Sequence, residues 1–347
     1  MKLAVFLPNW VGDAVMATPA LRAIRNHHRD AEIVAVLRRP IDEVLAGTGL
    51  VDRVLIHSPR GSDPWQRGLR FALRLRAEAF DVAILFPNSL RTAGLAFVSG
   101  AKRRIGFSRD RRGRLLTDAL TPKPRDVPHP VIDEYLRIAA HLGCEELSRK
   151  AEIAVLPDDE QRFETFRRSL PHELQSRPLI TLNPGGAFGS GKHWPTQHFA
   201  TLAQRIGGEL GHLTLVLCGP AERDQAREIV RLASHPLVAS LADEILSIGL
   251  TKAAVRASSL LVTTDSGPRH FAAPFGVPAV TLFGPTHIAW SETFSKDAVH
   301  LQVPVECGPC QQRVCPLGHH KCMVDLSVDR VFEAVQTVLH RRLRDAA

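Results

Sequence analysis

The chain has 347 residues, of which 44% are hydrophobic, and it carries a formal net charge of +8. This composition is typical of a globular protein with room for about two domains, and no apolar run reaches the ~18–20 residues of a membrane-spanning helix. The positive charge favours an anionic partner, which could be nucleic acid, acidic lipid or a phosphorylated substrate.

The first half of the chain alternates short apolar runs with helical patterns. The predicted strands cover residues 3–7, 33–37, 53–56 and 82–86, and the predicted helices cover 14–27, 67–79 and 133–142. The first run superficially resembles a signal peptide, but it has one positive charge and is interrupted by Pro8 and Asp13. It therefore predicts a buried strand of a cytoplasmic protein.

The second half repeats the same alternation. The predicted strands cover 179–182, 213–217, 259–263 and 279–283, and the predicted helices cover 196–210, 221–233, 243–257 and 268–275. Strands that alternate with helices predict parallel sheets covered on both faces, so we expect an α/β fold with two Rossmann-like domains. The expected domains are residues 1–155 and 156–326, followed by an amphipathic helix at 327–347, and ligands should bind beyond the carboxyl ends of the strands.

Two polar loops each follow a predicted strand and precede a predicted helix. Residues 263–270 (Thr-Thr-Asp-Ser-Gly-Pro-Arg-His) would expose backbone N–H groups at the positive end of a helix, where phosphate binds readily. Residues 182–195 contain four glycines, at 185, 186, 189 and 191, followed by Lys192. Glycine permits close backbone approach to a ligand, and the lysine supplies a charge for phosphate. Both loops together predict a nucleotide-diphosphate site.

Three further polar residues each allow two interpretations. Asp13 follows the first strand and could act as a general base, although a helix cap is the commoner role for Asp. Glu222 could accept hydrogen bonds from ribose hydroxyls or complement a helix dipole. His270 could point toward phosphate or pack internally.

A basic stretch spans residues 102–114. Its arginines are Arg103, Arg104, Arg109, Arg111, Arg112 and Arg114. They could bind an anionic partner or form a solvated face. Phe107 is the only aromatic residue among them, which argues against stacking on nucleic-acid bases.

Four of the six cysteines lie close together, at Cys307, Cys310, Cys315 and Cys322. In a cytoplasmic protein this spacing favours a metal over disulfides, although it matches neither a standard zinc ribbon nor a standard ferredoxin run. A structural zinc ion or iron–sulfur cluster, reduced thiols, and disulfides all remain open.

Three motifs resemble the heptosyltransferases of glycosyltransferase family 9, which use ADP-heptose. They are residues 10–13 (Trp-Val-Gly-Asp), 184–195 and 264–270 with 283–286, and the second has the form found in the type II enzymes of lipopolysaccharide synthesis. The resemblance spans nearly the whole chain. Pro268 and Arg269 depart from the Leu-Met pair expected there, and Gly186 departs from the Ala-Glu pairing of type II enzymes.

The resemblance implies a GT-B fold, in which two Rossmann-like domains face a central cleft and the C-terminal helix crosses back to the first domain. It implies inverting transfer of heptose from ADP-heptose to the heptose–Kdo–lipid A inner core of lipopolysaccharide. No cofactor is required for this transfer. The protein would be cytoplasmic and would associate peripherally with the inner face of the inner membrane.

The resemblance also assigns residues. Asp13 would be the general base, and Lys192 with the Gly185, Gly186 and Ala187 amides would hold the diphosphate. The loop residues Asp265, Ser266, Gly267 and His270 would complete the donor site, Glu222 would meet the ribose, and the arginines of 103–114 would hold the acidic acceptor. The alternatives are a related glycosyltransferase with another sugar nucleotide, and a nucleotide- or metal-binding module without turnover.

Overall fold

Two six-stranded parallel sheets organise the protein, one in each of two units, Met1–Ala154 and Val155–Ala347. The structure is a computed structural model that describes residues 1–124 and 126–346. Each unit is described by itself below. None of the helices in the described parts of the chain combines the length and the apolar character needed to cross a membrane.

The first unit has the strand order β3-β2-β1-β4-β5-β6. Its strands are β1 (Lys2–Phe6), β2 (Glu32–Leu37), β3 (Arg53–Ile56), β4 (Val82–Leu85), β5 (Arg103–Phe107) and β6 (Asp118–Leu120). Its helices are α1 (Val11–His27), α2 (Ile41–Leu45), α3 (Gly68–Ala77), α4 (Leu90–Val98) and α5 (Val131–His141), with short 3-10 turns η1 (Pro64–Gln66) and η2 (Arg112–Leu115).

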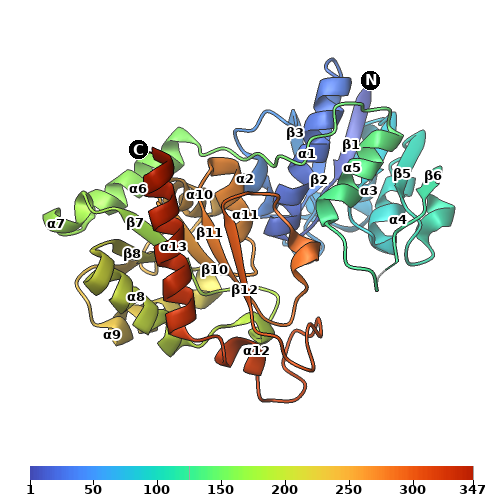
Figure 1. Cartoon of the computed structure of the whole chain (residues 1–347). Helices are drawn as coiled ribbons and strands as arrows, with labels where there is room; N and C mark the ends of the chain where they lie inside the picture. The colour runs from blue at the N-terminus through green and yellow to red at the C-terminus, as the bar shows by residue number, and fades with distance from the viewer. Residues whose placement is uncertain (125, 347) are drawn as a thin grey trace. The chain divides into compact units, whose positions relative to one another are not determined.

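Burial explains this sheet. All four residues of β4 are buried, as are the last four of β1, so helices cover both faces of these central strands. Helices α1 and α5 pack against each other on this unit (Figure 1). The core around Phe6, Val34, Phe71 and Leu85 is continuous.

The second unit has the order β12-β11-β10-β7-β8-β9. Its strands are β7 (Leu179–Asn183), β8 (Leu213–Val216), β9 (Val238–Ser240), β10 (Leu260–Thr264), β11 (Ala279–Phe283) and β12 (Ala298–Gln302). Its helices are α6 (Pro157–Ser169), α7 (His172–Gln175), α8 (Thr196–Leu210), α9 (Arg223–Ala233), α10 (Ile248–Arg256), α11 (Arg269–Ala272), α12 (Lys321–Val324) and α13 (Val328–Ala346). Its 3-10 turns are η3 (Ser190–Lys192), η4 (Pro220–Glu222), η5 (Ala273–Phe275) and η6 (Ile288–Ser291).

The C-terminal helix α13 packs within the second unit. Its apolar stripe, which includes Val331, Phe332 and Val335, belongs to the same core as Trp194 and Phe199. The helix contacts α8, β10 and β11 (Figure 1). The expected crossing of this helix to the first domain stays a prediction, since these contacts concern the second unit alone.

Both sheets have the same chain order, since each unit adds three strands outward on one side and then three on the other. The order reverses between β1 and β4 in the first unit and between β7 and β10 in the second. Ligands of open parallel sheets bind beyond the carboxyl ends of the strands at such a switch point. Ligand sites are therefore expected at the loops that follow these four strands.

Candidate functional site

In the second unit the two predicted phosphate loops lie side by side. Strands β7 and β10 are paired in parallel, so the loops that follow them leave the same edge of the sheet. The Thr264 hydroxyl donates to the Gly185 carbonyl at 2.7 Å, and the Asn183 side-chain amide donates to Ser266 Oγ, also at 2.7 Å. The structure therefore brings together the glycine-rich loop and the Thr-Asp-Ser-Gly loop, as the sequence predicted.

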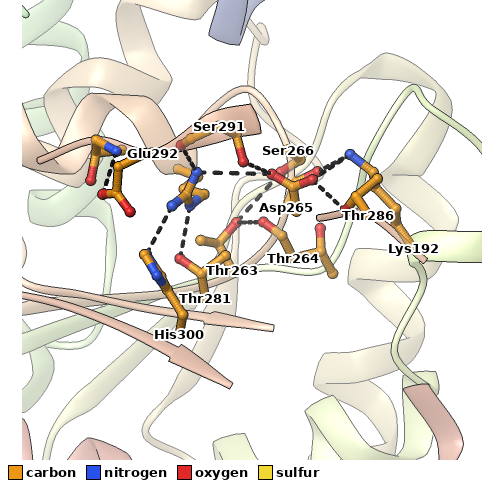
Figure 2. Close-up of polar contacts among 12 residues, drawn as sticks. Lys192, Thr263, Thr264, Asp265, Ser266, Thr281, Thr286, Ser291, Glu292 and His300 are labelled. Atoms are coloured by element: carbon orange, nitrogen blue, oxygen red, sulfur yellow. Dashed lines mark hydrogen bonds and ion pairs between the residues drawn. The ribbon is translucent and has the colours of Figure 1, made fainter. Parts of the chain in front are cut away.

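Asp265 is the centre of a buried polar network (Figure 2). Its Oδ2 accepts hydrogen bonds from Lys192 Nζ at 2.6 Å and from the Thr286 hydroxyl at 2.7 Å. Its Oδ1 accepts one from the Ser291 hydroxyl at 3.0 Å. Lys192 Nζ also donates to the backbone oxygen of Asp265 at 2.8 Å. The carboxylate thus holds its own loop in place through contacts with protein groups.

The ionised state of Asp265 is favoured despite its burial. Burial alone would raise the pKa of this carboxyl, but the positive charges of Lys192 and Arg269, with the hydrogen bonds from Lys192 and Thr286, lower the pKa to about 2. Asp265 is therefore an ionised, buried carboxylate at neutral pH, and Lys192 Nζ lies 2.6 Å from it. The predicted roles of Lys192 as a phosphate ligand and of Asp265 as a donor ligand stay predictions, because here each side chain binds the other.

Arg269 is a member of this network that sequence reasoning did not assign. The side chain is 1% exposed, and Nε donates to the Thr281 hydroxyl at 3.1 Å. Its guanidinium also donates to the Ser291 carbonyl and lies 3.9 Å from Asp265 Oδ1. The available signal was a cation four residues after Asp265, at the point where the loop enters α11.

His270 is buried and does not supply positive charge. Burial, followed by the nearby charge of Arg269, lowers its pKa to about 3, so the imidazole is neutral at pH 7. The helix that this residue belongs to, α11, is only four residues long and continues as the 3-10 turn η5. A helix this short sums few peptide dipoles, so the predicted dipole contribution to phosphate binding is small here.

Glu222 is connected to the glycine-rich loop. Its carboxylate accepts the Gly186 N–H at 3.0 Å and the Gly219 N–H at 2.7 Å. A Cβ on Gly185 would lie 2.3 Å from Glu222 Cδ, so any larger residue there would displace the Glu222 carboxylate. The Gly186 amide, which the sequence assigned to a phosphate, therefore holds a carboxylate in this structure. This contact demonstrates an anion-binding amide, and it makes Glu222 a competitor for any phosphate at that position.

The remaining predicted donor residues lie at the surface of these loops. Ala187 is exposed, and Gly267 is half-buried at the turn into α11. Beside them the Phe188 ring lies 4.4 Å from Lys192 Nζ and 5.6 Å from the Arg313 guanidinium. Phe188 thus lies close to two cations, a position that the sequence did not reveal.

Asp13 lies in the first turn of α1, at the carboxyl end of β1, where the strand order of the first sheet reverses. Trp10 occupies the N-cap position, so Asp13 is not the capping residue itself. Burial, followed by the negative charge of Asp13, raises the pKa of Tyr135 well above its ordinary value, which places the two side chains near each other. The general-base role stays a prediction.

Most of the six arginines predicted to bind the acceptor are bound to the protein itself. Arg112 is fully buried and donates to the Phe107 carbonyl at 2.8 Å, so its guanidinium is engaged with the protein, and its acceptor-binding role stays a prediction. Arg103 pairs with Asp118 at 2.8 Å, and Arg104 donates to the Leu115 carbonyl at 2.8 Å.

The other three arginines of this stretch differ in exposure and in their partners. Arg109 donates to the Lys123 carbonyl at 2.6 Å, whereas Arg111 and Arg114 are exposed. Backbone carbonyls and one carboxylate thus take up the donors of four arginines in the stretch. The basic stretch is mainly a structural feature around β5 and η2.

A different basic cluster lines a cavity of about 570 Å³ in the first unit. Arg38 follows β2, His57 and Arg60 follow β3, and Arg91 lies in the first turn of α4. A second cavity of about 310 Å³ shares Arg38, His57 and Arg91 and reaches residues of the loops after β1 and β4. The second cavity lies at the switch point of the first sheet, where a ligand is expected, and the first adjoins it at the ends of β2 and β3.

The charges of this cluster are uncompensated. Burial and the like charges of Arg91 and Arg60 lower the pKa of Arg38. Burial, Arg38 and Arg91 lower the pKa of His57 to about 4, so it is neutral at pH 7. Within residues 1–124 and 126–346, neither Arg38, Arg60 nor Arg91 forms an ion pair. The sequence signal was a basic residue directly after a buried strand.

The four clustered cysteines carry free thiols and line one small pocket together with His319 and His320. No set of three or more His, Cys, Asp or Glu side chains in the described residues is arranged to hold a metal ion, so the zinc or iron–sulfur interpretation stays a prediction. The segment supports the glycine-rich loop: His320 Nε2 lies 2.8 Å from the Gly191 carbonyl, and the Gly191 N–H donates to the Arg313 carbonyl at 2.8 Å.

Comparison with known proteins decides the family. Residues 68–321 match the profile of glycosyltransferase family 9 (heptosyltransferase). The chain belongs to this family. It is 28% identical to a lipooligosaccharide heptosyltransferase 2 of Campylobacter jejuni, with 98% of each protein covered.

Solved structures agree with this assignment to glycosyltransferase family 9. A family 9 glycosyltransferase of Veillonella parvula matches with a TM-score of 0.80 and 25% identity, over 98% of this chain and 97% of that one. The ADP-heptose lipopolysaccharide heptosyltransferase II of Escherichia coli matches with a TM-score of 0.79 and 23% identity over 100% of both chains. The predicted GT-B fold class and the prediction of a glycosyltransferase are both confirmed.

Proposed function

We propose that this glycosyltransferase transfers heptose from ADP-heptose to the inner core of lipopolysaccharide. The observation that carries the proposal is the pair of loops at the switch point of the second sheet, which are joined by hydrogen bonds. Together they contain all three parts of a nucleotide-diphosphate site: glycine amides, a lysine and a Thr-Asp-Ser-Gly turn. The similarity to named heptosyltransferases supports the choice of sugar and acceptor.

The proposed reaction inverts the sugar carbon. An acceptor hydroxyl attacks the anomeric carbon, a new carbon–oxygen bond forms, and the bond from that carbon to the β-phosphate oxygen breaks. Asp13 takes the hydroxyl proton, and ADP leaves with the bonding electrons. Negative charge therefore grows on the diphosphate, where fixed N–H groups of Gly186 and Ala187 and the charge of Lys192 stabilise the transition state more than the ground state.

Two rearrangements accompany donor binding in this proposal. The diphosphate replaces the Glu222 carboxylate on the Gly186 amide, which frees Glu222 for the ribose hydroxyls. Lys192 shares its ammonium protons between Asp265 and a phosphate oxygen, since an ammonium group has three donors. Asp265 and Arg269 act as positioning residues, because their polar atoms are engaged with other protein groups.

The acceptor binds in the first unit in this proposal. The cavity around Arg38, Arg60 and Arg91 offers positive charge without a neighbouring carboxylate, which suits the acidic sugars of the inner core. Arg111 and Arg114 are left with a minor role, because they are exposed and each charge is screened at ordinary salt. We place the enzyme in the cytoplasm, where ADP-heptose would be available.

One experiment tests this function. Purified protein is incubated with ADP-heptose and a panel of truncated lipopolysaccharide cores, while ADP release and product mass are measured. We expect release of ADP with the acceptor that ends in heptose–Kdo, and activity that persists in EDTA because protein groups stabilise the phosphate charge. Turnover with another sugar nucleotide, or no turnover on any acceptor, would contradict the proposal.

A further inference from the structure

Helix α4 presents an unusual apolar face in the first unit. Leu90, Phe97 and Val98 are 55%, 53% and 41% exposed, and Gly94 lies between them on the same side of the helix. The buried face of this helix is formed by Ala93 and Ala96. A surface helix normally directs its large apolar side chains inward, so this outward stripe indicates a contact with a partner.

Helix α3 packs against α4 (Figure 1) and also carries exposed apolar residues. Leu69 and Leu73 are 76% and 55% exposed, while Phe71 and Leu75 hold the helix to the core. Trp65, which is 56% exposed, precedes α3 in the turn η1. We call the exposed residues Trp65, Leu69, Leu73, Leu90, Phe97 and Val98 the apolar face.

Positive charges surround the apolar face. Helices α3 and α4 contain Arg70, Arg74, Arg76 and Arg91 and no Asp or Glu. The Arg70 guanidinium lies 5.8 Å from the Trp65 ring, and the Arg104 guanidinium lies 5.4 Å from the Phe97 ring. Glu78, the first acid after α3, is bound to Arg53 at 2.7 Å and to Lys2. The face therefore combines exposed large apolar groups with uncompensated arginines.

We propose that the apolar face of α3 and α4 docks the enzyme onto an anionic lipid bilayer. A helix that lies in the bilayer interface has large apolar side chains on one side, Trp at the boundary and Arg beside them, which reach toward lipid phosphates. An acidic groove on a protein partner would also complement the arginines. The row of exposed leucines, however, suits contact with lipid acyl chains rather than with an acidic groove.

This docking deepens the proposed function and rests on it in one respect. Arg91 stands at the start of α4, next to the exposed Leu90, and it lines the basic cavity of the first unit. A lipid-linked acidic sugar would therefore meet the cavity at the edge of the face that contacts the bilayer. The enzyme then searches for its acceptor in two dimensions at the membrane, with the cavity oriented toward the sugar headgroup.

The test measures vesicle binding without acceptor or ADP-heptose, so its result does not depend on the transfer reaction. Wild-type protein is sedimented with vesicles of phosphatidylcholine alone and with vesicles that also contain phosphatidylglycerol. We expect binding to the anionic vesicles that weakens as salt is raised, because charges near the surface are screened within a Debye length. Equal binding to both vesicle types, or none to either, overturns the proposal.

Two triple variants separate the apolar and charged contributions. Leu69→Gln, Leu73→Gln and Phe97→Gln together should weaken binding roughly ten-fold or more through lost apolar burial. Arg70→Gln, Arg74→Gln and Arg76→Gln together should weaken it by roughly 100-fold, at about five-fold for each arginine near an anionic surface. If both triples bind like the wild type, the proposal is wrong.

Matched controls come from the second unit. Ile245→Gln, Val314→Gln and Leu317→Gln alter apolar side chains that are 80%, 65% and 62% exposed, and Arg168→Gln, Arg231→Gln and Arg341→Gln remove three exposed arginines. Both control triples should bind vesicles like the wild type. If the control triples lose vesicle binding equally, overall charge or overall surface hydrophobicity drives the binding, and the assignment to α3 and α4 is overturned.

Activity measurements distinguish docking from catalysis. On a delipidated core oligosaccharide, the apolar triple should keep wild-type turnover, whereas on acceptor embedded in vesicles it should lose activity in parallel with binding. Loss of turnover on the soluble acceptor would place these residues in the active site and overturn the docking role. Concentration-dependent dimers that the apolar triple abolishes, without vesicle binding, would identify a second copy of the chain as the partner instead.

Discussion

The two switch points of this glycosyltransferase differ in how their charges are compensated. In the second unit, Lys192, Asp265 and Arg269 form a closed network in which each charge already has a protein partner. In the first unit, Arg38, Arg60 and Arg91 line an open cavity without a carboxylate. In the proposed reaction the donor has to displace the Glu222 carboxylate from the Gly186 amide, whereas the open cationic cavity can take an anion without displacing a protein carboxylate.

This contrast predicts that substitutions in the two units separate cleanly. The second unit should control stability and donor binding together, because its charges brace the loops. The first unit should control acceptor binding and the proton transfer with little effect on stability.

The largest effect is expected at Asp13. Asp13→Ala should lower turnover by roughly 10²–10⁴-fold, because loss of a general base typically costs that much. The melting temperature and ADP affinity should stay near those of the wild type, since Asp13 lies outside the second unit. Single-turnover kinetics with saturating substrates measure the effect. Near-normal turnover would remove Asp13 from the mechanism. Asp13 would then be only a first-turn residue whose negative charge complements the dipole of α1.

The next effect is expected at the buried ion pair. Lys192→Met should lower the free energy of unfolding by roughly 3–5 kcal/mol, because it leaves a buried carboxylate without its closest cation. Chemical denaturation measures this, and calorimetry should show weaker ADP-heptose binding. The acceptor KM, taken at saturating donor, should change little.

The double variant Lys192→Met with Asp265→Asn is the control for this pair. It should recover part of the lost stability, because no unpaired carboxylate remains, but it should not recover donor binding. If the single variant is destabilised by less than about 1 kcal/mol, the pair behaves like an exposed one and the bracing role is wrong.

The basic cavity of the first unit should affect the acceptor alone. Arg38→Gln with Arg91→Gln should raise the acceptor KM by roughly 10–100-fold, because each of the two hydrogen bonds lost in an open, solvent-screened cavity contributes about 1 kcal/mol. Donor KM and the melting temperature should hold. The two arginines repel each other, so their removal breaks no stabilising ion pair between them. An unchanged acceptor KM at low salt would move the acceptor site elsewhere.

Acid should destabilise the second unit through His270. Burial lowers its pKa to about 3 from 6.5, so the unfolded chain binds a proton below pH 6.5 that the folded chain rejects. Its contribution to stability is therefore fully present above pH 6.5 and is lost as pH falls toward 3. Between pH 6.5 and 4.5, His270→Gln should lose on the order of 2 kcal/mol less than the wild type. Parallel stability curves for both proteins would contradict a buried neutral imidazole.

Much of this fold could be predicted from the sequence, because buried parallel strands are nearly continuous apolar runs. The strand at 279–283 and the helix at 196–210 match β11 and α8 residue for residue. Strand β5 was missed because Arg103 and Arg104 disguise it, although Ile105 and Phe107 are buried. Short edge strands such as β6 and β12 bury too little to produce a recognisable pattern.

The site was predictable in part. The glycine-rich loop and the Thr-Asp-Ser-Gly loop are recognisable in the sequence as polar segments after strands. In the structure a hydrogen bond connects them. Their internal pairing was not predictable, because Lys192 and Asp265 are 73 positions apart and either could have faced a ligand. Burial of Arg112 was equally hidden, since a fully buried arginine and a solvated one have the same local sequence.

The smallest effect is expected at the exposed end of the basic stretch, and it sharpens the contrast between the two sets of arginines. Arg111→Gln with Arg114→Gln should change the acceptor KM by less than about three-fold, since isolated exposed charges interact weakly and are screened at ordinary salt. Arg38→Gln with Arg91→Gln removes the same net charge from the same unit, so the two double variants differ only in where the charge lies. If acceptor binding depends on overall charge, both variants will raise the acceptor KM equally and the salt dependence will flatten equally. If acceptor binding depends on the cavity, only the variant at Arg38 and Arg91 will raise the acceptor KM. The guanidinium groups that it removes converge on one space at the carboxyl edge of the sheet.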